Sequence, residues 1–233
     1  MHFKITYICL YFNVMVTRSE ENYLKAIYHL GKQGTVAVST NAIAEKIESK
    51  ASSVTDMIKK LAEKNLANYV KYQGVTLTES GRLAAALVIR KHRLWEVFLV
   101  EKLNFTWDEV HDVAEQLEHI KSPKLVNELD ALLGFPTHDP HGDPIPDKDG
   151  HYTPLKSVNI LEVEPGNEGV LARVIDSSDV FLKYLNKNNL ALGDTIKVLY
   201  FEPFDHSLTI ETATKKMIIS NAVAKNLFIS QEL

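Results

Sequence analysis

Hydrophobic positions in the first third of the chain recur at the spacing of an amphipathic helix. In residues 19–31, SEENYLKAIYHLG, apolar side chains stand three and four positions apart. Ser19 is the expected N-cap, and Gly31 is the expected stop. The same spacing predicts two more helices, at residues 41–47 and 52–64.

The pattern then changes from helix to hairpin. Residues 67–71 and 75–78 are rich in β-prone side chains and flank Tyr-Gln-Gly, a tight-turn sequence. Three helices followed by a hairpin are the order of a winged helix-turn-helix. We therefore predict a winged-helix domain over residues 15–78, with 52–64 as its recognition helix.

Longer helical stretches follow the hairpin. Residues 79–103, 107–120 and 123–133 have helical periodicity, and they define a predicted helical domain over residues 79–134. The next segment, 135–154, holds five of the chain's eight prolines, which predicts a locally stiff linker.

The final part, residues 155–233, alternates apolar and polar positions in short runs. Five such runs, separated by turn signals, predict a small five-stranded barrel. The expected fold class is mainly α with a small β domain.

The first residues stand apart from this pattern. Residues 3–16 are apolar but too short to span a bilayer, which takes about 20 residues. Met15 directly precedes a clear helix start, so we interpret it as the natural start and residues 1–14 as an upstream extension. An edge strand or a membrane-touching segment is the alternative.

Composition narrows the possible functions. With 45% hydrophobic and 24% charged residues, the chain has the composition of an ordinary globular protein. The single cysteine excludes an internal disulfide and a cysteine-only metal site, and it favours a cytoplasmic setting. Residues 15–92 hold 12 Lys and Arg against 7 Asp and Glu, whereas residues 93–233 hold 13 against 23. The basic N-terminal part, residues 15–92, suggests a polyanionic partner. The alternative is that an uneven distribution of charge of this size arises by chance.

Two neighbouring helices carry imidazole and carboxylate side chains at one-turn spacing. In residues 107–120, His111, Glu115 and His119 are each four apart, and on the preceding helix His92 and Glu96 are four apart. Oxygen and nitrogen ligands without thiolate suit Mn²⁺ or Fe²⁺, and Zn²⁺ would also bind. The alternative is that these are solvated helix faces.

Five stretches of the chain carry a family resemblance: SEENYLKAIYHL, SSVTDMIKKL, LTESGRLAAALVIRKHRLWEVFL, VHDVAEQLEHI and PHGDPIP. The sequence resembles the metal-dependent repressors of the diphtheria toxin repressor and manganese transport regulator family. The resemblance implies a winged-helix DNA-binding domain, a helical metal-binding and dimerisation domain, and a C-terminal SH3-like barrel. It also implies a homodimer that binds double-stranded operator DNA and represses metal-uptake genes.

The resemblance also assigns metal ligands by motif. VHDVAEQLEHI places Glu115, Glu118 and His119 as primary ligands, and RKHRLWE places His92 and Glu96, with His111, at a second or neighbouring site. Asp176 or Asp179 of the barrel lies where longer members can add a carboxylate.

The metal preference stays open between Mn²⁺ and Fe²⁺. Glutamate at the position of Glu115 is typical of manganese-sensing members, and iron-sensing members typically have cysteine there. The first helix departs from the manganese pattern of aspartate and glutamate, because Asn22 and Lys25 stand at those positions. Asn22 can ligate through its amide oxygen, but Lys25 would repel a nearby cation, which argues against a two-metal cluster.

The predicted DNA-binding face lies on the winged-helix domain, residues 15–78. The N-terminal half of helix 52–64 would enter the major groove, and the wing would lie along the backbone or minor groove. A solvated surface is the alternative for each residue. The candidate DNA contacts are Arg18, Thr40, Ser52, Ser53, Thr55, Asp56, Lys59, Lys60, Tyr69, Lys71 and Gln73.

We therefore expect a metal-activated repressor in which metal selects one orientation of the DNA-binding domain. A winged-helix regulator that ignores metal is the first alternative. A metallo-hydrolase is the second, although the sequence has neither a phosphate-binding glycine loop nor an HExxH motif. We expect no small-molecule substrate and no membrane association. We interpret His138, Asp139, His141 and Asp143 of the linker as a solvated turn, with another metal site as the alternative.

Overall fold

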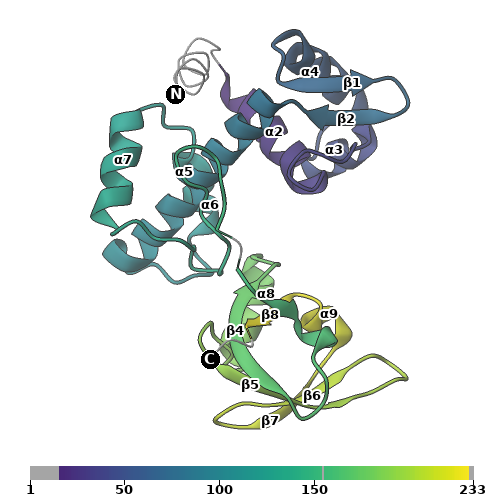
Figure 1. Cartoon of the computed structure of the whole chain (residues 1–233), viewed down its shortest axis with the longest axis vertical. Coiled ribbons are helices and arrows are strands. Elements are labelled where there is room, and N and C mark those ends of the chain that lie inside the picture. Colours follow the sequence, from purple (N-terminus) through teal and green to yellow (C-terminus); the bar gives the residue numbers. More distant parts are fainter. Residues whose placement is uncertain (1–15, 154, 231–233) are drawn as a thin grey trace. The chain divides into compact units, whose positions relative to one another are not determined.

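The computed structural model describes residues 16–153 and 155–230 (Figure 1). These residues form two compact units. The first unit contains the described residues up to His92, together with Leu117–Lys121 and Pro146–His151. The second contains Arg93–Gln116, Ser122–Ile145 and the described residues from Tyr152 onward. The expected N-terminal extension, residues 1–14, and the expected start at Met15 lie outside the described residues.

The first unit is built on the predicted winged helix. A β-bridge joins Val38 to Val75, and a hydrophobic core that includes Leu24, Ile43 and Ile58 fills the space between the elements. The elements are α2 (Arg18–Leu30), α3 (Thr40–Lys46), α4 (Ala51–Glu63), β1 (Ala67–Val70) and β2 (Gly74–Leu77).

The helix caps differ from the prediction. Helix α2 begins two residues early, because Thr17 and Glu20 form a capping box: the Thr17 hydroxyl accepts from the Glu20 amide, and the Glu20 carboxylate accepts from the Thr17 amide at 2.8 Å. Helix α3 begins at Thr40, one residue before the predicted start, because Ser39 is its N-cap.

The remaining helices are α5 (Glu79–Leu103), α6 (His111–Leu117) and α7 (Pro123–Leu132). Helix α6 is shorter than the predicted 107–120. A turn in which the Thr106 amide bonds the Glu109 carboxylate precedes it. After Leu117, residues Glu118 and His119 form a turn and bond to other parts of the first unit.

The C-terminal part of the second unit is a six-stranded antiparallel sheet, not the predicted five-stranded one. Its order is β3-β8-β4-β5-β6-β7, and its buried face forms one hydrophobic cluster around Leu171, Leu182 and Ile196. The prediction missed β8, a short run directly after a helical piece, and it made the first strand too long, because the run predicted over residues 158–164 is a strand only at Val158–Asn159 and continues as η1. The elements are β3 (Val158–Asn159), η1 (Ile160–Glu162), β4 (Glu168–Val174), α8 (Asp179–Lys187), β5 (Thr195–Phe201), β6 (Leu208–Glu211), β7 (Lys216–Ile219), α9 (Asn221–Ala224) and β8 (Leu227–Ser230).

No helix in the described part of the chain is long and apolar enough to cross a membrane. The predicted fold class, mainly helical with a small β domain, is confirmed by these elements.

Candidate metal centre

Glu118 lies at the centre of a polar cluster inside the first unit. Its side chain is fully buried, and its two carboxylate oxygens accept from the Lys25 ammonium, each at 2.8 Å. Nδ1 of His92, on α5, lies 2.7 Å from the same carboxylate. Burial opposes ionisation of Glu118, but the His92 hydrogen bond and the Lys25 charge outweigh it and lower the pKa of the Glu118 carboxyl.

A second ion pair joins this cluster. Nδ1 of His119 lies 2.5 Å from the carboxylate of Glu21 on α2, and the same carboxylate lies 3.5 Å from the ammonium of Lys91. Sequence reasoning did not select Glu21. Its signal was its place beside Asn22, which the resemblance did select. We call Glu21, Asn22, Lys25, Lys91, His92, Glu118 and His119 the first cluster.

Two polar atoms of the first cluster are buried without a hydrogen-bond partner. They are the amide oxygen of Asn22 and Nε2 of His119, and the latter lies 3.6 Å from Glu118. An unpartnered buried acceptor normally costs about 1–3 kcal/mol, so such atoms call for an explanation. An amide oxygen, an imidazole nitrogen and a carboxylate are together a donor set for a divalent cation. The residues present therefore fit a metal ion.

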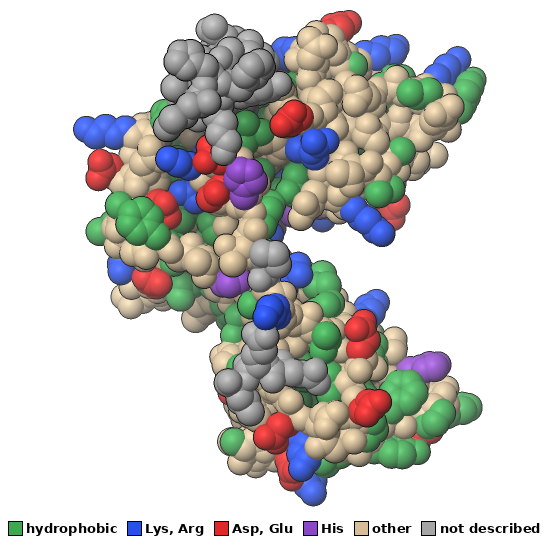
Figure 2. Space-filling view, viewed as in Figure 1, with side chains coloured by type: hydrophobic (Ala, Val, Ile, Leu, Met, Phe, Trp, Pro, Cys, Tyr) green, Lys and Arg blue, Asp and Glu red, His purple; other side chains and the backbone are tan. Residues whose placement is uncertain are grey.

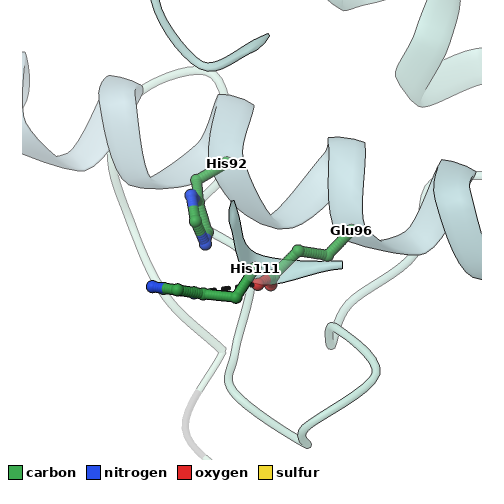
Figure 3. A group of neighbouring side chains, drawn as sticks. All are labelled: His92, Glu96 and His111. Carbon is green, nitrogen blue, oxygen red and sulfur yellow. Dashed lines mark ion pairs between the residues drawn. The ribbon is translucent and has the colours of Figure 1, made fainter. Parts of the chain in front are cut away.

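A second polar cluster lies one turn further along α5. Glu96, four residues after His92, is buried, and its Oε1 lies 3.5 Å from Nδ1 of His111 at the start of α6 (Figure 3). His111 also lies 3.8 Å from Glu115, one turn further along α6. The one-turn pairing predicted for His111 and Glu115 is therefore present, on a half-exposed helix face.

Glu96 also meets two residues that we interpreted from sequence as part of a solvated turn. Ligand atoms of Glu96, Asp139 and His141 lie within 4.8 Å of one another, and all three residues are buried. The solvated-turn interpretation is therefore wrong for Asp139 and His141. We call Glu96, His111, Glu115, Asp139 and His141 the second cluster.

Burial and close-lying charges shift the pKa values of two residues in the second cluster. Burial, together with the negative charges of Glu96 and Asp143, raises the pKa of Asp139 to about 7. Burial disfavours the charged form of His141, but the hydrogen bond and charge of Glu96 outweigh it and raise the pKa of His141 to about 9. Two carboxylates and an imidazole in a buried pocket suit a bound cation, which would stabilise both carboxylates in the ionised form.

Long-range contacts within the second unit hold Asp139 and His141 in place. Arg93 of α5 contacts Asp139 at 3.3 Å and Asp143 at 3.0 Å, and Asp143 also pairs with Arg173 of β4. The backbone oxygen of His141 accepts from the Val174 amide at 2.9 Å. The proline-rich segment is therefore bonded to the barrel and to α5 through residues 139–143.

The two barrel candidates lie elsewhere. Asp179 begins α8 and pairs with Lys183 one turn later, and Asp176 accepts from the Ser178 amide. Among the described residues, neither aspartate belongs to a group of three ligand side chains within reach of one ion.

The candidate DNA contacts lie mostly on the exposed surface of the winged helix. On α4, the side chains of Ser52, Ser53, Asp56, Lys59 and Lys60 are exposed and Thr55 is half-buried. Lys71 and Gln73 are exposed at the tip of the β1–β2 hairpin. Arg18 is exposed, and Thr40 and Tyr69 are half-buried. Basic side chains project around α4 and β1 on the face shown in Figure 2.

Family comparisons cover almost all of the described chain. Residues 15–75 match the iron dependent repressor N-terminal DNA binding domain, and residues 78–147 match the iron dependent repressor metal binding and dimerisation domain. Residues 158–231 match the FeoA domain.

Individual relatives agree with these matches. The iron-dependent repressor IdeR of Mycobacterium tuberculosis is 35% identical over 126 residues, which are 54% of this chain and 54% of that protein. The chain thus spans about half the length of this curated relative. The diphtheria toxin repressor of Corynebacterium efficiens is 28% identical over 165 residues, 69% of this chain and 71% of that protein.

Solved structures extend the likeness to the whole fold. A manganese-dependent transcriptional repressor in complex with manganese is 36% identical, with a TM-score of 0.83 over 91% of this chain and 99% of that one. The manganese regulator SloR is also 36% identical, with a TM-score of 0.75 over 91% of this chain and 98% of that one. These matches confirm the resemblance seen in the sequence, and the chain belongs to the family of iron- and manganese-dependent transcriptional repressors.

Proposed function

We propose that this protein is a DNA-binding repressor activated by a divalent metal ion that binds at the first cluster. The observation that carries the proposal is Nε2 of His119, which is buried without a hydrogen-bond partner 3.6 Å from the buried carboxylate of Glu118. The amide oxygen of Asn22, next to Glu21 on α2, is also buried and unpartnered. A metal ion would give both atoms a partner. The Glu118 carboxylate and the His92 imidazole lie in the same cluster as further donors.

We propose the second cluster as another metal site. Glu96, Asp139 and His141 offer two carboxylates and an imidazole within reach of one ion, and His111 and Glu115 lie beside them along α6. We therefore propose Asp139 and His141, in place of Asp176 and Asp179, as the metal ligands that follow the predicted helical domain in the sequence.

Mn²⁺ is the metal we propose, with Fe²⁺ as the alternative. The two clusters supply oxygen and nitrogen donors and no thiolate, which suits these ions. The two solved relatives named above are manganese regulators, whereas the curated relative from Mycobacterium tuberculosis is an iron-dependent repressor.

Double-stranded operator DNA and a second copy of the chain are the proposed partners. The exposed hydroxyls and lysines of α4 provide the groove-facing surface, and Lys71 of the wing provides a phosphate contact. Metal strengthens DNA binding only as far as it binds the DNA-competent state more tightly than the other states. By linkage, operator DNA then tightens metal binding by the same factor.

Fluorescence anisotropy on DNA from the protein's own upstream region tests the proposal. The protein is titrated anaerobically at fixed salt with chelator, Mn²⁺, Fe²⁺ or Zn²⁺. We expect tight binding with Mn²⁺ or Fe²⁺ and loss of this response in Glu118→Ala. Asp112→Ala removes an exposed carboxylate of α6 outside both clusters, and it should respond like the wild type.

Equal DNA binding in chelator and in metal would refute metal activation and favour the metal-independent regulator. His141→Ala separates the two clusters: if the second cluster contributes, this variant needs more metal for the same DNA occupancy. If it responds like the wild type, the proposal is limited to the first cluster.

A further inference from the structure

The ammonium of Lys25 is bonded to the Glu118 carboxylate, which a metal ion at the first cluster would need as a ligand. The ammonium lies 2.8 Å from both oxygens of Glu118, and the Lys25 side chain is only 15% exposed. Nζ therefore bridges the two oxygens of a carboxylate that is itself fully buried. Charge-assisted hydrogen bonds of this kind are about twice as strong as neutral ones.

Each carboxylate of the first cluster already has an ammonium partner without a metal ion. The two carboxylates, Glu21 and Glu118, face two ammonium groups, those of Lys25 and Lys91. A divalent ion that entered while both lysines stayed in place would add two uncompensated positive charges to a largely buried site. Such charge burial is strongly unfavourable, so binding is expected to displace one ammonium.

Of the two ammonium groups, that of Lys25 contacts Glu118, so it is the one that an ion bound to Glu118 would displace. Asn22 precedes Lys25 by three residues on α2, so the two side chains share one helix face. Nε2 of His119, which is buried without a hydrogen-bond partner, lies 3.6 Å from Glu118, whose carboxylate accepts from the Lys25 ammonium. A lysine has a flexible four-carbon stem, and this one is partly exposed, so its ammonium can move to water.

We propose that Lys25 is a built-in competitor of the metal ion for Glu118, and that it sets the metal concentration at which the protein responds. The proposal rests on metal binding at the first cluster as the function above assigns it. It names Lys25 as a residue that determines affinity without being a ligand.

The test is the Mn²⁺ affinity of the full-length protein, measured from free aqueous Mn²⁺ by electron paramagnetic resonance at fixed pH and salt. Lys25→Leu removes the charge, keeps much of the bulk and adds no ligand atom. We expect it to bind Mn²⁺ at least tenfold more tightly at the site that Glu118→Ala removes. Lys25→Arg keeps the charge and should stay within about threefold of the wild type. Lys64→Leu is the matched control, because Lys64 pairs at 2.7 Å with buried Glu20 elsewhere on α2.

Thermal unfolding in chelator provides an independent readout. Without Lys25, Glu118 loses its ammonium partner and keeps contacts with the imidazoles of His92 and His119, so Lys25→Leu should melt at a lower temperature than the wild type and gain more from added Mn²⁺. If Lys25→Leu does not fold in chelator, Lys25→Ala titrated from the Mn²⁺-loaded state gives the same comparison of affinities.

Unchanged or weaker Mn²⁺ binding in both Lys25→Leu and Lys25→Ala would overturn the competition while leaving the proposed function intact. An affinity gain of equal size in Lys25→Arg would also overturn it, because that variant keeps the charge. Failure of the proposed function looks different: wild type and Glu118→Ala would then bind Mn²⁺ equally.

Discussion

Gly142 is the position where one added methyl group should separate the second cluster from the barrel. Its φ is +84°, and a Cβ built there would lie 2.1 Å from the Ala172 oxygen and 2.7 Å from the Arg173 Cα. Both are backbone atoms, so no side-chain rotation relieves the clash. Gly142→Ala must therefore move residues 139–143 away from β4 or distort the loop.

The expected cost has two parts. An alanine at positive φ costs about 1–2 kcal/mol. Separation from β4 removes the hydrogen bond from the Val174 amide to the His141 oxygen and the Asp143–Arg173 pair. Losing buried partners of this kind costs about 1–3 kcal/mol. The sum is about 2–5 kcal/mol of unfolding free energy.

Urea unfolding in chelator, followed by tryptophan fluorescence, measures this cost. Gly134→Ala is the matched control, because Gly134 has φ +73° and nothing within 4 Å of its built Cβ. It should lose only the 1–2 kcal/mol of the backbone term. If Gly142→Ala loses no more than Gly134→Ala, the loop does not pack on β4 as described, and the second cluster loses its support.

Three further predictions follow from other contacts. Burial raises the pKa of Glu20, but the hydrogen bonds and charge of Lys64 and the hydrogen bonds of Thr17 together outweigh it and lower this pKa, so the contribution of Glu20 to stability is present above about pH 4.5 and lost as pH falls through the lower folded-state pKa. Glu20→Gln should therefore be less stable than the wild type at pH 7, with a gap that narrows in acid. A gap that is constant with pH would contradict this. Asn186→Ala removes the acceptor of the Trp107 indole, a bond of 2.8 Å, and should cost about 0.5–1.5 kcal/mol in the same urea assay. No loss would show that the indole bond contributes nothing to packing of Trp107 on the barrel. Lys59→Ala should weaken operator binding about equally across sequences and reduce the slope of log affinity against log salt by about one. An unchanged slope would exclude Lys59 as a phosphate contact.

Elements with strong periodicity were predictable from the sequence. The apolar stripe of α2 and the tight turn between β1 and β2 appear where the pattern placed them. Helix ends were less predictable, because Thr17 and Ser19 are both good caps and only Thr17 is paired with a glutamate three residues later.

The chemistry was predictable only in part. The one-turn spacing of His111 and Glu115 survives because both lie within α6. The same rule fails for His119, since α6 ends at Leu117 and His119 bonds to Glu21 of α2. Spacing along a helix carries information only as far as the helix extends.

Asp139 and His141 show a different limit. Polar residues between prolines have the composition of a solvated turn, and no local pattern distinguishes a solvated turn from a buried one. Their burial comes from Arg93 and from β4, which stand dozens of residues away in the sequence. The local signal available was Gly142, whose position leaves no space for a side chain.

The role inferred for Lys25 from the sequence differs from the role that its contacts in the structure indicate. From sequence, a lysine near acidic ligands implies repulsion of a cation, an effect that solvent and salt weaken with distance. In the structure the same ammonium is bound to Glu118, which is fully buried. A cation that enters is then opposed by a specific bond that must break, and a bond of this kind is screened far less than a long-range field. If the proposed competition holds, the charge that argued against a second metal ion therefore sets the metal concentration at which an ion displaces Lys25 from Glu118.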